Sequence, residues 1–374
     1  MISSSQETQQ SVTPKYPKLG SHGSARLPRP IAWAACLLFL TGLAIVCYRR
    51  PIPDDFDRYM YEAILLGKSQ PIQSVYDKVK HESPRAEASS VLDSPQHLQE
   101  LEPLYAIRPI YLGILSALSR LLPIQRAINL VSAASLLAIG IVVLVWTGKP
   151  LQTSLLMAVS PILNLGRMGT PDALAALFAI AAVWLIYVRR QNIGGLVLLF
   201  VSLGIRTDNI LLLLAVLVWL FWQRRIPLYF SGLLALLAIS MVAAINHSAG
   251  NYGWIVLFRF SFVGGRYPAQ IPHSLTLSEY SRAFFAGLVP ALPQLSVWIL
   301  IGLWAGLRRP NVLLAVIASA VVAHFLLFPS PEVRYLLWAG IIAAALLICS
   351  FAEPEAEISD IERSRRSAIA TPSA

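Results

Sequence analysis

Acidic residues, arginines and tyrosines occur together in four short segments of this 374-residue chain. The first segment, Pro51 to Tyr59, contains the neighbouring carboxylates of Asp54 and Asp55. Adjacent carboxylates raise each other's pKa by repulsion or share a cation. They can therefore act as a general base or anchor a metal ion and a phosphate. A solvated acidic turn at a membrane interface has the same composition, so both interpretations stay open.

The second segment, Arg167 to Asp172, opens an apolar stretch. Thr170 is suited to the N-cap of a helix and Pro171 to its first turn, where Asp172 would complement the helix dipole. This capping role accounts for Asp172 without any chemistry. Alternatively, Asp172 faces the same cavity as the aspartates of the first segment.

The third segment is Arg206-Thr207-Asp208, and it follows an apolar stretch, residues 193–205, that is short for a membrane span. Thirteen helical residues measure about 20 Å, less than the thickness of the hydrocarbon layer. We therefore expect the segment to lie below the membrane interface. Arg206 and Asp208 there either pair with each other or with the second segment, or Arg206 holds a phosphate.

The fourth segment, Glu332 to Tyr335, precedes the last apolar stretch. The planar guanidinium of Arg334 suits phosphate oxygens, and Tyr335 can donate a hydrogen bond or stack on a sugar. Arg and Tyr also anchor helices at membrane interfaces, which is the alternative. We expect His324 to be a packed polar residue. The chain lacks nucleotide-binding motifs, so an enzyme of this type needs a substrate found outside the cytoplasm, such as a lipid-linked one.

The composition excludes a soluble enzyme, because 56% of the residues are hydrophobic and 13% are charged, against about 25% charged in soluble domains. The net charge of +10 is typical of cytoplasmic loops in a membrane protein, so we expect no nucleic-acid partner. The three cysteines have neither metal-ligand nor disulfide spacing. The first apolar stretch is long enough to span and is interpreted as an uncleaved helix.

The apolar stretches predict an all-α, polytopic membrane protein with about ten transmembrane helices. A stretch at 105–122 fits a helix on the membrane surface better than a span, because its polar residues share one side. It belongs to a long outer loop, residues 49–126, that we expect to carry interfacial helices. The ten predicted spans are 31–48, 127–147, 151–166, 171–188, 193–205, 209–222, 226–245, 283–306, 311–328 and 333–351.

With ten spans, connectors that contain arginine or lysine but no acid alternate with connectors that contain both. The positive-inside rule places the acid-free connectors in the cytoplasm and the four polar segments outside. Both termini are then cytoplasmic, as disordered tails at residues 1–30 and 352–374 around a domain at 31–351. The acid-free connectors contain Lys149, Arg189-Arg190, Arg224-Arg225 and Arg308-Arg309.

The order of these motifs resembles the GT-C superfamily of membrane glycosyltransferases, which includes protein O-mannosyltransferases and lipid A aminoarabinose transferases. The resemblance covers roughly residues 31–351. It rests on the acidic pair after the first helix, an aromatic and Arg-Pro stretch at Tyr105 to Pro109, the segment from Pro161 to Asp172, and the late Arg334-Tyr335. It implies a multi-pass protein of a cell membrane, interpreted as the bacterial inner membrane.

The resemblance also implies an activity, the transfer of a sugar from a polyprenyl-phosphate donor to a hydroxyl of a glycan, lipid or protein acceptor, with inversion. Asp54 or Asp55 would be the general base, and Asp172 would position substrate or bind a divalent cation. The remaining candidates would bind substrate. Arg167, Arg206 or Arg334 would bind the phosphate, and Tyr59, Tyr105 or Tyr335 would stack on the sugar ring. Asp208 and Arg108 would contact other parts of the substrate.

Three other functions stay open. A transporter or flippase of lipid-linked substrates is favoured by the deep position expected for Arg206 to Asp208. A polysaccharide ligase or polymerase is favoured by arginines in a second outer segment, Arg259, Arg266 and Arg282. A non-catalytic membrane scaffold gives no reason for paired acids and arginines at one membrane face.

Overall fold

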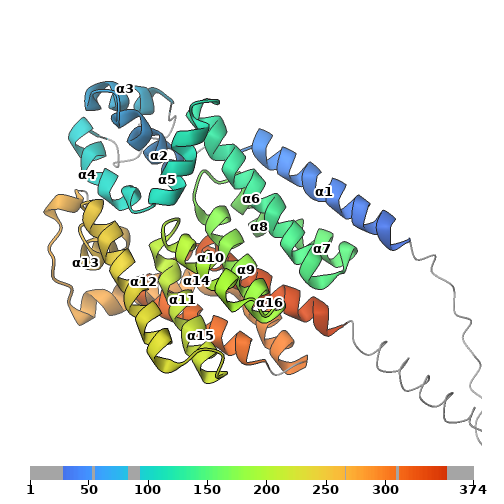
Figure 1. Ribbon diagram of the computed structural model, residues 1–374. Coiled ribbons are helices and arrows are strands. Elements are labelled where there is room, and N and C mark those ends of the chain that lie inside the picture. The colour runs from blue at the N-terminus through green and yellow to red at the C-terminus, as the bar shows by residue number, and fades with distance from the viewer. Residues whose placement is uncertain (1–27, 53–54, 83–92, 266, 309–310, 352–374) are drawn as a thin grey trace, which may run out of the picture.

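The computed structural model describes residues 28–52, 55–82, 93–265, 267–308 and 311–351 (Figure 1). Within these residues every regular element is a helix, as predicted for the fold class. The N-terminal half contains α1 (Arg29–Arg49), α2 (Phe56–Gly67), α3 (Ile72–Glu82), α4 (Pro95–Ala106), α5 (Pro109–Leu118), α6 (Ile124–Thr147), α7 (Pro150–Met157), α8 (Ser160–Arg167) and α9 (Asp172–Tyr187).

The C-terminal half adds the helices α10 to α16 and the short turns η1 to η4. Of the two tails predicted at the ends of the chain, only residues 28–30 are described, and they lead into α1. The elements are α10 (Asn192–Leu203), η1 (Thr207–Asn209), α11 (Ile210–Trp222), α12 (Leu228–Ser248), α13 (Trp254–Phe258), η2 (Arg259–Val263), η3 (Pro268–Gln270), α14 (Leu277–Arg308), α15 (Val312–Leu327), η4 (Val333–Tyr335) and α16 (Leu337–Ser350).

Four helices, α1, α6, α12 and α14, are long and apolar enough to cross a membrane, with mean hydropathies between 1.8 and 2.5. A fifth candidate is the pair α8 and α9, which together pass the same test but are bent by 118°. Only 11% of the apolar window is buried in α12 and in α14, so both expose leucines and aromatics as a lipid-facing helix does. These features indicate a membrane protein.

Two of the differences from the predicted boundaries have a cause in the local sequence. The stretch predicted as one span at 151–166 is divided into α7 and α8, because the helix breaks before the Ser160-Pro161 pair. The surface helix predicted at 105–122 begins only at Pro109, since the residue before a proline avoids the helical conformation. Several other predicted spans are helices of 10–17 residues, and the full set of ten stays a prediction.

Buried apolar side chains of the described helices form three adjoining cores. Helices α2, α3 and α4 pack around Met60, Val75 and Leu101, all of which are fully buried. A larger core joins α1, α6, α9, α10, α11, α15 and α16, and α2 and α5 pack onto α6 beside it. In Figure 1 the helices α2 to α5 gather at one end of the longer helices. The candidate site lies where these two groups of helices meet.

Two glycines allow close approach of chain segments near this boundary. A Cβ atom on Gly287 of α14 would lie 1.8 Å from the carbonyl oxygen of Pro329, so only glycine fits where α14 crosses the segment leading to η4. A Cβ atom on Gly169, between α8 and α9, would lie 2.5 Å from the Cβ of Arg58 in α2. The first glycine lets α14 pack against the segment that leads to η4, and the second lets the α8–α9 connection pack against α2.

Candidate functional site

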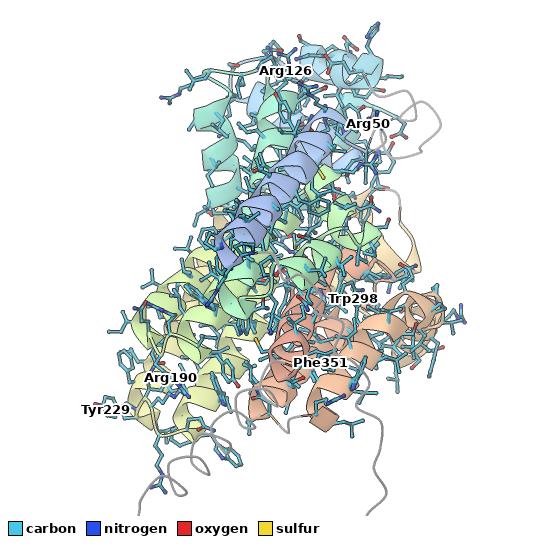
Figure 2. The ribbon with its side chains drawn as sticks, turned by 90° about the vertical axis from the view of Figure 1, so that its right-hand side faces the viewer. Arg50, Arg126, Arg190, Tyr229, Trp298 and Phe351 are labelled. Atoms are coloured by element: carbon cyan, nitrogen blue, oxygen red, sulfur yellow. The ribbon has the colours of Figure 1, made fainter. Side chains whose placement is uncertain are left out.

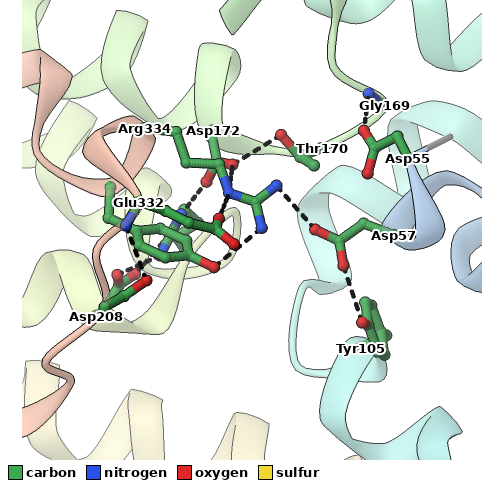
Figure 3. A network of polar contacts seen from close by, with 12 residues as sticks. Asp55, Asp57, Tyr105, Gly169, Thr170, Asp172, Asp208, Glu332 and Arg334 are labelled. Atoms are coloured by element: carbon green, nitrogen blue, oxygen red, sulfur yellow. Dashed lines mark hydrogen bonds and ion pairs between the residues drawn. The ribbon is translucent and has the colours of Figure 1, made fainter. Parts of the chain in front are cut away.

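The site is formed where four helical elements begin. Asp57 lies in the first turn of α2, Asp172 opens α9, Asp208 lies in η1 before α11, and Arg334 lies in η4 before α16. The bend between α8 and α9 brings the start of α9 to this place. Figure 3 shows these side chains pointing toward one another across the boundary between the two groups of helices.

Arg206 is enclosed by two carboxylates. Its Nε and Nη2 atoms donate to the two oxygens of Asp208 over 2.9 and 2.5 Å, and Nη1 donates to Oδ1 of Asp172. The Arg206 side chain is 12% exposed and that of Asp172 is 3% exposed. A buried arginine without such partners would be strongly destabilising, so the two aspartates are needed here. Nδ1 of His324 lies 3.4 Å from Asp208 Oδ2 and extends the chain of polar contacts.

Arg334 is the second centre of the network. Its Nη1 lies 3.1 Å from Asp57 Oδ2, its Nε lies 3.6 Å from Asp172 Oδ2 and also contacts Glu332, and Nη2 donates to the Tyr335 hydroxyl over 3.0 Å. Asp172 thus links the two arginines. The ring of Tyr335 lies 4.7 Å from the guanidinium of Arg206 and 5.0 Å from that of Arg334, within the range of cation–π contacts.

Asp55 lies in the connection between α1 and α2, outside the membrane-spanning helices. Its Oδ2 accepts a hydrogen bond of 2.6 Å from the backbone N–H of Gly169. Burial, and then the neighbouring carboxylate of Asp57, raise the pKa of Asp55 to about 6, although Arg334 acts in the opposite direction. Asp57 in turn accepts a hydrogen bond of 2.8 Å from the Tyr105 hydroxyl.

A cavity of about 640 Å³ adjoins the network. Asp55, Asp57, Glu332 and Arg334 line one part of it, and the rest of the lining comes from the α1–α2 connection, the start of α2, α8 and the residue after it, α14, η4 and the start of α16. This size suits a small ligand group such as a sugar. The other lining residues are Ile52, Phe56, Ser160, Pro161, Asn164, Met168, Gln294, Val333 and Leu337.

Most of the predicted site residues come together in this network. The members that sequence reasoning named are Asp55, Asp172, Arg206, Asp208, Arg334 and Tyr335. Arg108 lies beside the network, with its guanidinium 5.3 Å from the ring of Tyr105 and 5.5 Å from that of Tyr61. Residues separated by more than 250 positions thus share one site.

Three other predicted site residues do not join this network. Asp54 lies outside the described residues. Tyr59 faces the core of α2, α3 and α4, and its hydroxyl donates to the carbonyl of Glu82, so it does not line the cavity as predicted for a sugar-stacking residue. Arg167 donates to the carbonyl of Arg50 over 2.8 Å, so it joins the ends of α8 and α1 instead of facing the two arginines of the network.

Sequence reasoning missed two members of the network. Asp57 was passed over in favour of the adjacent pair Asp54-Asp55, although position 57 lies in the first turn of a helix that begins after Asp55. For His324 the sequence predicts a packed polar residue. It is indeed buried, but it contacts Asp208 and its ring lies 6.1 Å from that of Tyr335. A single polar ring one turn before the end of α15 was the signal.

The resemblance implies that Asp172 could bind a divalent cation, but the described residues do not form a site for one. In this part of the chain no group of three or more His, Cys, Asp or Glu side chains is arranged to hold an ion. The carboxylates of Asp57, Asp172 and Asp208 are instead bound to guanidiniums and hydroxyls. We therefore derive no step through a metal.

Comparison of the chain with models of known protein families, with curated sequences and with solved structures gives no significant match. The resemblance to the GT-C superfamily therefore depends on the motifs themselves, and the function must be argued from the site.

Proposed function

We propose that this protein is an integral-membrane glycosyltransferase that moves a sugar from a polyprenyl-phosphate donor to an acceptor hydroxyl. The observation that carries this proposal is that Asp55, with its buried carboxylate, and Arg334 both line the same cavity. A base and a cation on the same cavity are what an inverting transfer from a phosphate leaving group needs. The donor would reach the cavity from the lipid, and the four candidate spans indicate a membrane protein.

Asp55 would act as the general base. Its pKa of about 6 lies close to physiological pH, where a carboxylate is both ionised and basic enough to accept a proton. The acceptor hydroxyl would give its proton to Asp55 while its oxygen forms a bond to the anomeric carbon. The bond from that carbon to the phosphate oxygen would break at the opposite face, which inverts the configuration.

Arg334 would stabilise the phosphate as its negative charge develops. The guanidinium is already in place, held by Asp57 and Asp172, so little reorganisation is needed. Glu332 is the most exposed of its partners, with 49% of the side chain accessible. An incoming phosphate would replace this contact most readily. Tyr335 contacts both guanidiniums through its ring and accepts a hydrogen bond from Arg334, so it would help to position Arg334 beside the cavity.

The test is a transfer assay with protein reconstituted into liposomes, a panel of radiolabelled polyprenyl-phosphate sugars, and glycan, lipid and peptide acceptors. Asp55→Asn keeps the shape of the side chain and removes the base, so the rate should fall by about 10²- to 10⁴-fold. The matched control is Asp77→Asn, an exposed carboxylate of α3, which should transfer at the rate of the unchanged protein. Full activity of Asp55→Asn would overturn the assignment.

A transporter or flippase of lipid-linked substrates is a second candidate, and the break between α8 and α9 favours it. Transporters often bind their substrates where a membrane helix is interrupted, and this pair is bent by 118° beside Asp172. Translocation of a fluorescent polyprenyl-phosphate sugar in the same liposomes distinguishes the two. Movement without transfer to any acceptor would favour the transporter. The ligase interpretation is less supported, because Arg259 is already paired with Glu279 at 2.9 Å.

A further inference from the structure

The helices α9 and α11 both end in a pair of arginines far from the network. Arg189-Arg190 follow α9 and Arg224-Arg225 follow α11, and we call these four residues the arginine doublets. Because α9 has sixteen residues, about 24 Å separates its start at the network from its other end. Figure 2 shows Arg190 and Tyr229 at one end of the molecule and Arg50 and Arg126 at the other.

The second doublet contacts the end of α9, where the first doublet follows. Nη1 of Arg225 donates to the carbonyl oxygen of Ile186 over 3.1 Å, which ties the second doublet to the end of α9. The rings of Tyr187 and Trp219 lie 6.3 Å apart one turn deeper. The doublets therefore form one basic surface contributed by two connections of the chain.

No carboxylate neutralises this surface in the described part of the chain. None of the four arginines takes part in an ion pair between described residues, and the only acid between Ala173 and Ser278 is Asp208, at the far end of α11. The guanidiniums of Arg189 and Arg225 instead lie over the rings of Trp184 and Trp219, at 5.9 and 5.2 Å. Three of the arginines are exposed, namely Arg189, Arg190 and Arg224.

Two of these arginines have a backbone conformation that normally favours glycine. Arg190 has a φ angle of 58° and Arg224 of 53°, and they are the only residues other than glycine with positive φ among those described. Each ends a helix, the position at which glycine is most common. The left-handed conformation costs a non-glycine residue about 1–2 kcal/mol. An arginine at both positions, in place of the residue the backbone favours, points to a role for the guanidinium.

The surroundings indicate what these guanidiniums meet. Trp222 and Tyr229 flank the second doublet and are 78% and 79% exposed. Trp and Tyr with this exposure at the ends of apolar helices lie at the level of the lipid headgroups. Exposed guanidiniums at that level meet phosphates, to which they bind through two parallel hydrogen bonds. We propose that the arginine doublets bind the phosphate headgroup of an anionic phospholipid of the surrounding bilayer.

The proposal is tested on the full-length protein in lipid nanodiscs that contain phosphatidylcholine alone or with phosphatidylglycerol. Binding of phosphatidylglycerol is measured by native mass spectrometry and by the shift of the unfolding temperature. The test variant is the double substitution Arg190→Gly and Arg224→Gly, which keeps the backbone conformation and removes two charges. Affinity for phosphatidylglycerol should fall about fivefold for each arginine, or about twenty-fivefold in the double variant.

The matched control removes two charges from the opposite end, through Arg120→Gln and Arg126→Gln, both at exposed positions. It should bind phosphatidylglycerol as the unchanged protein does. A further arm adds soluble glycerol phosphate, which should give no shift. Equal binding by the glycine variant and the unchanged protein would overturn the proposal, and so would a shift with soluble phosphate that matches the shift with lipid. This site is independent of sugar transfer, so it can stand if the proposed enzymatic activity fails.

Discussion

Helices α9 and α11 have arginines near both of their ends, and these arginines differ in their ion pairing and in their exposure to solvent. At one end Arg206 is bound to Asp172 and Asp208 and is 12% exposed. At the other end the arginine doublets have no described carboxylate beside them and most of them are exposed. The difference follows from the surroundings, since a charge within an apolar bundle needs a partner, while a charge at headgroup level finds one in the lipid.

The network end has more carboxylates than guanidiniums. Asp55, Asp57, Asp172, Asp208 and Glu332 all lie in or beside it, against Arg206 and Arg334 at its centre and Arg108 at its edge. Burial is the main cause of the raised pKa of Asp55, and the neighbouring negative charge of Asp57 raises it further. The end that holds the most acids is therefore also the end that can hold and release a proton.

The largest expected effect comes from breaking the network at the carboxylate that both arginines share. Asp172→Asn keeps the size of the side chain but leaves Arg206 and Arg334 with less negative charge in a buried place. Loss of one partner from a buried ion pair costs about 3–5 kcal/mol. The unfolding temperature in detergent should drop sharply. Glu332→Gln is the control, because Glu332 is half exposed and its loss should cost about 1 kcal/mol or less. Equal effects of the two substitutions would contradict the comparison.

The second prediction concerns a substitution that should shift the network without changing any charged residue. Gly287→Ala puts a methyl group where Pro329 passes, so the segment leading to Glu332 and Arg334 must shift. Such overpacking costs about 1–3 kcal/mol, and in a transfer assay the rate should fall with it. Gly302→Ala in the same helix has no atom within 4 Å of the new carbon and serves as the control. If both variants unfold at the temperature of the unchanged protein, α14 does not constrain the site.

The third prediction uses the pKa of Asp55. If this carboxylate is the base, the transfer rate should fall about tenfold for each pH unit below 6 and level off above pH 7. Stability should change in the opposite sense. Because the pKa of about 6 in the folded protein exceeds the ordinary value of 3.8, ionised Asp55 destabilises the fold, and stability is lost as the pH rises from about 4 to 6.

Asp55→Asn removes this ionisation and supplies the control. Its unfolding temperature should exceed that of the unchanged protein above pH 6, and the two should converge near pH 4. A constant difference across this range would show that Asp55 keeps an ordinary pKa, and the assignment of the base would then lose its physical support.

Much of this architecture could be predicted from the sequence, and the parts that could not share a cause. Apolar stretches predict most of the long helices, and the pairing of Arg206 with Asp208 is one of the alternatives that the sequence leaves open. Which distant residues meet depends on how the helices pack. The role of Asp57 required knowing that α2 begins at Phe56, and the contact of His324 with Asp208 required the packing of α15 on α11. The break between α8 and α9 falls at the connector predicted between residues 166 and 171, but the sequence does not give the angle of 118° between the two helices.

The smallest expected effect is at the other end of the comparison. In a bilayer of phosphatidylcholine alone, Arg190 has no anionic headgroup to bind and retains only the strain of its positive φ. Arg190→Gly relieves that strain but makes the unfolded chain more flexible, so the net gain in stability should be about 0.5–1 kcal/mol. Arg189→Gly removes the same charge at a position without positive φ and should destabilise the protein instead. In bilayers that contain phosphatidylglycerol, Arg190→Gly should instead be less stable than the unchanged protein. Binding of the lipid by Arg190 would then offset the strain of its positive φ. If Arg190→Gly is more stable than the unchanged protein in both bilayers, Arg190 contributes nothing to lipid binding. Its only measurable effect is then the backbone strain at the end of α9.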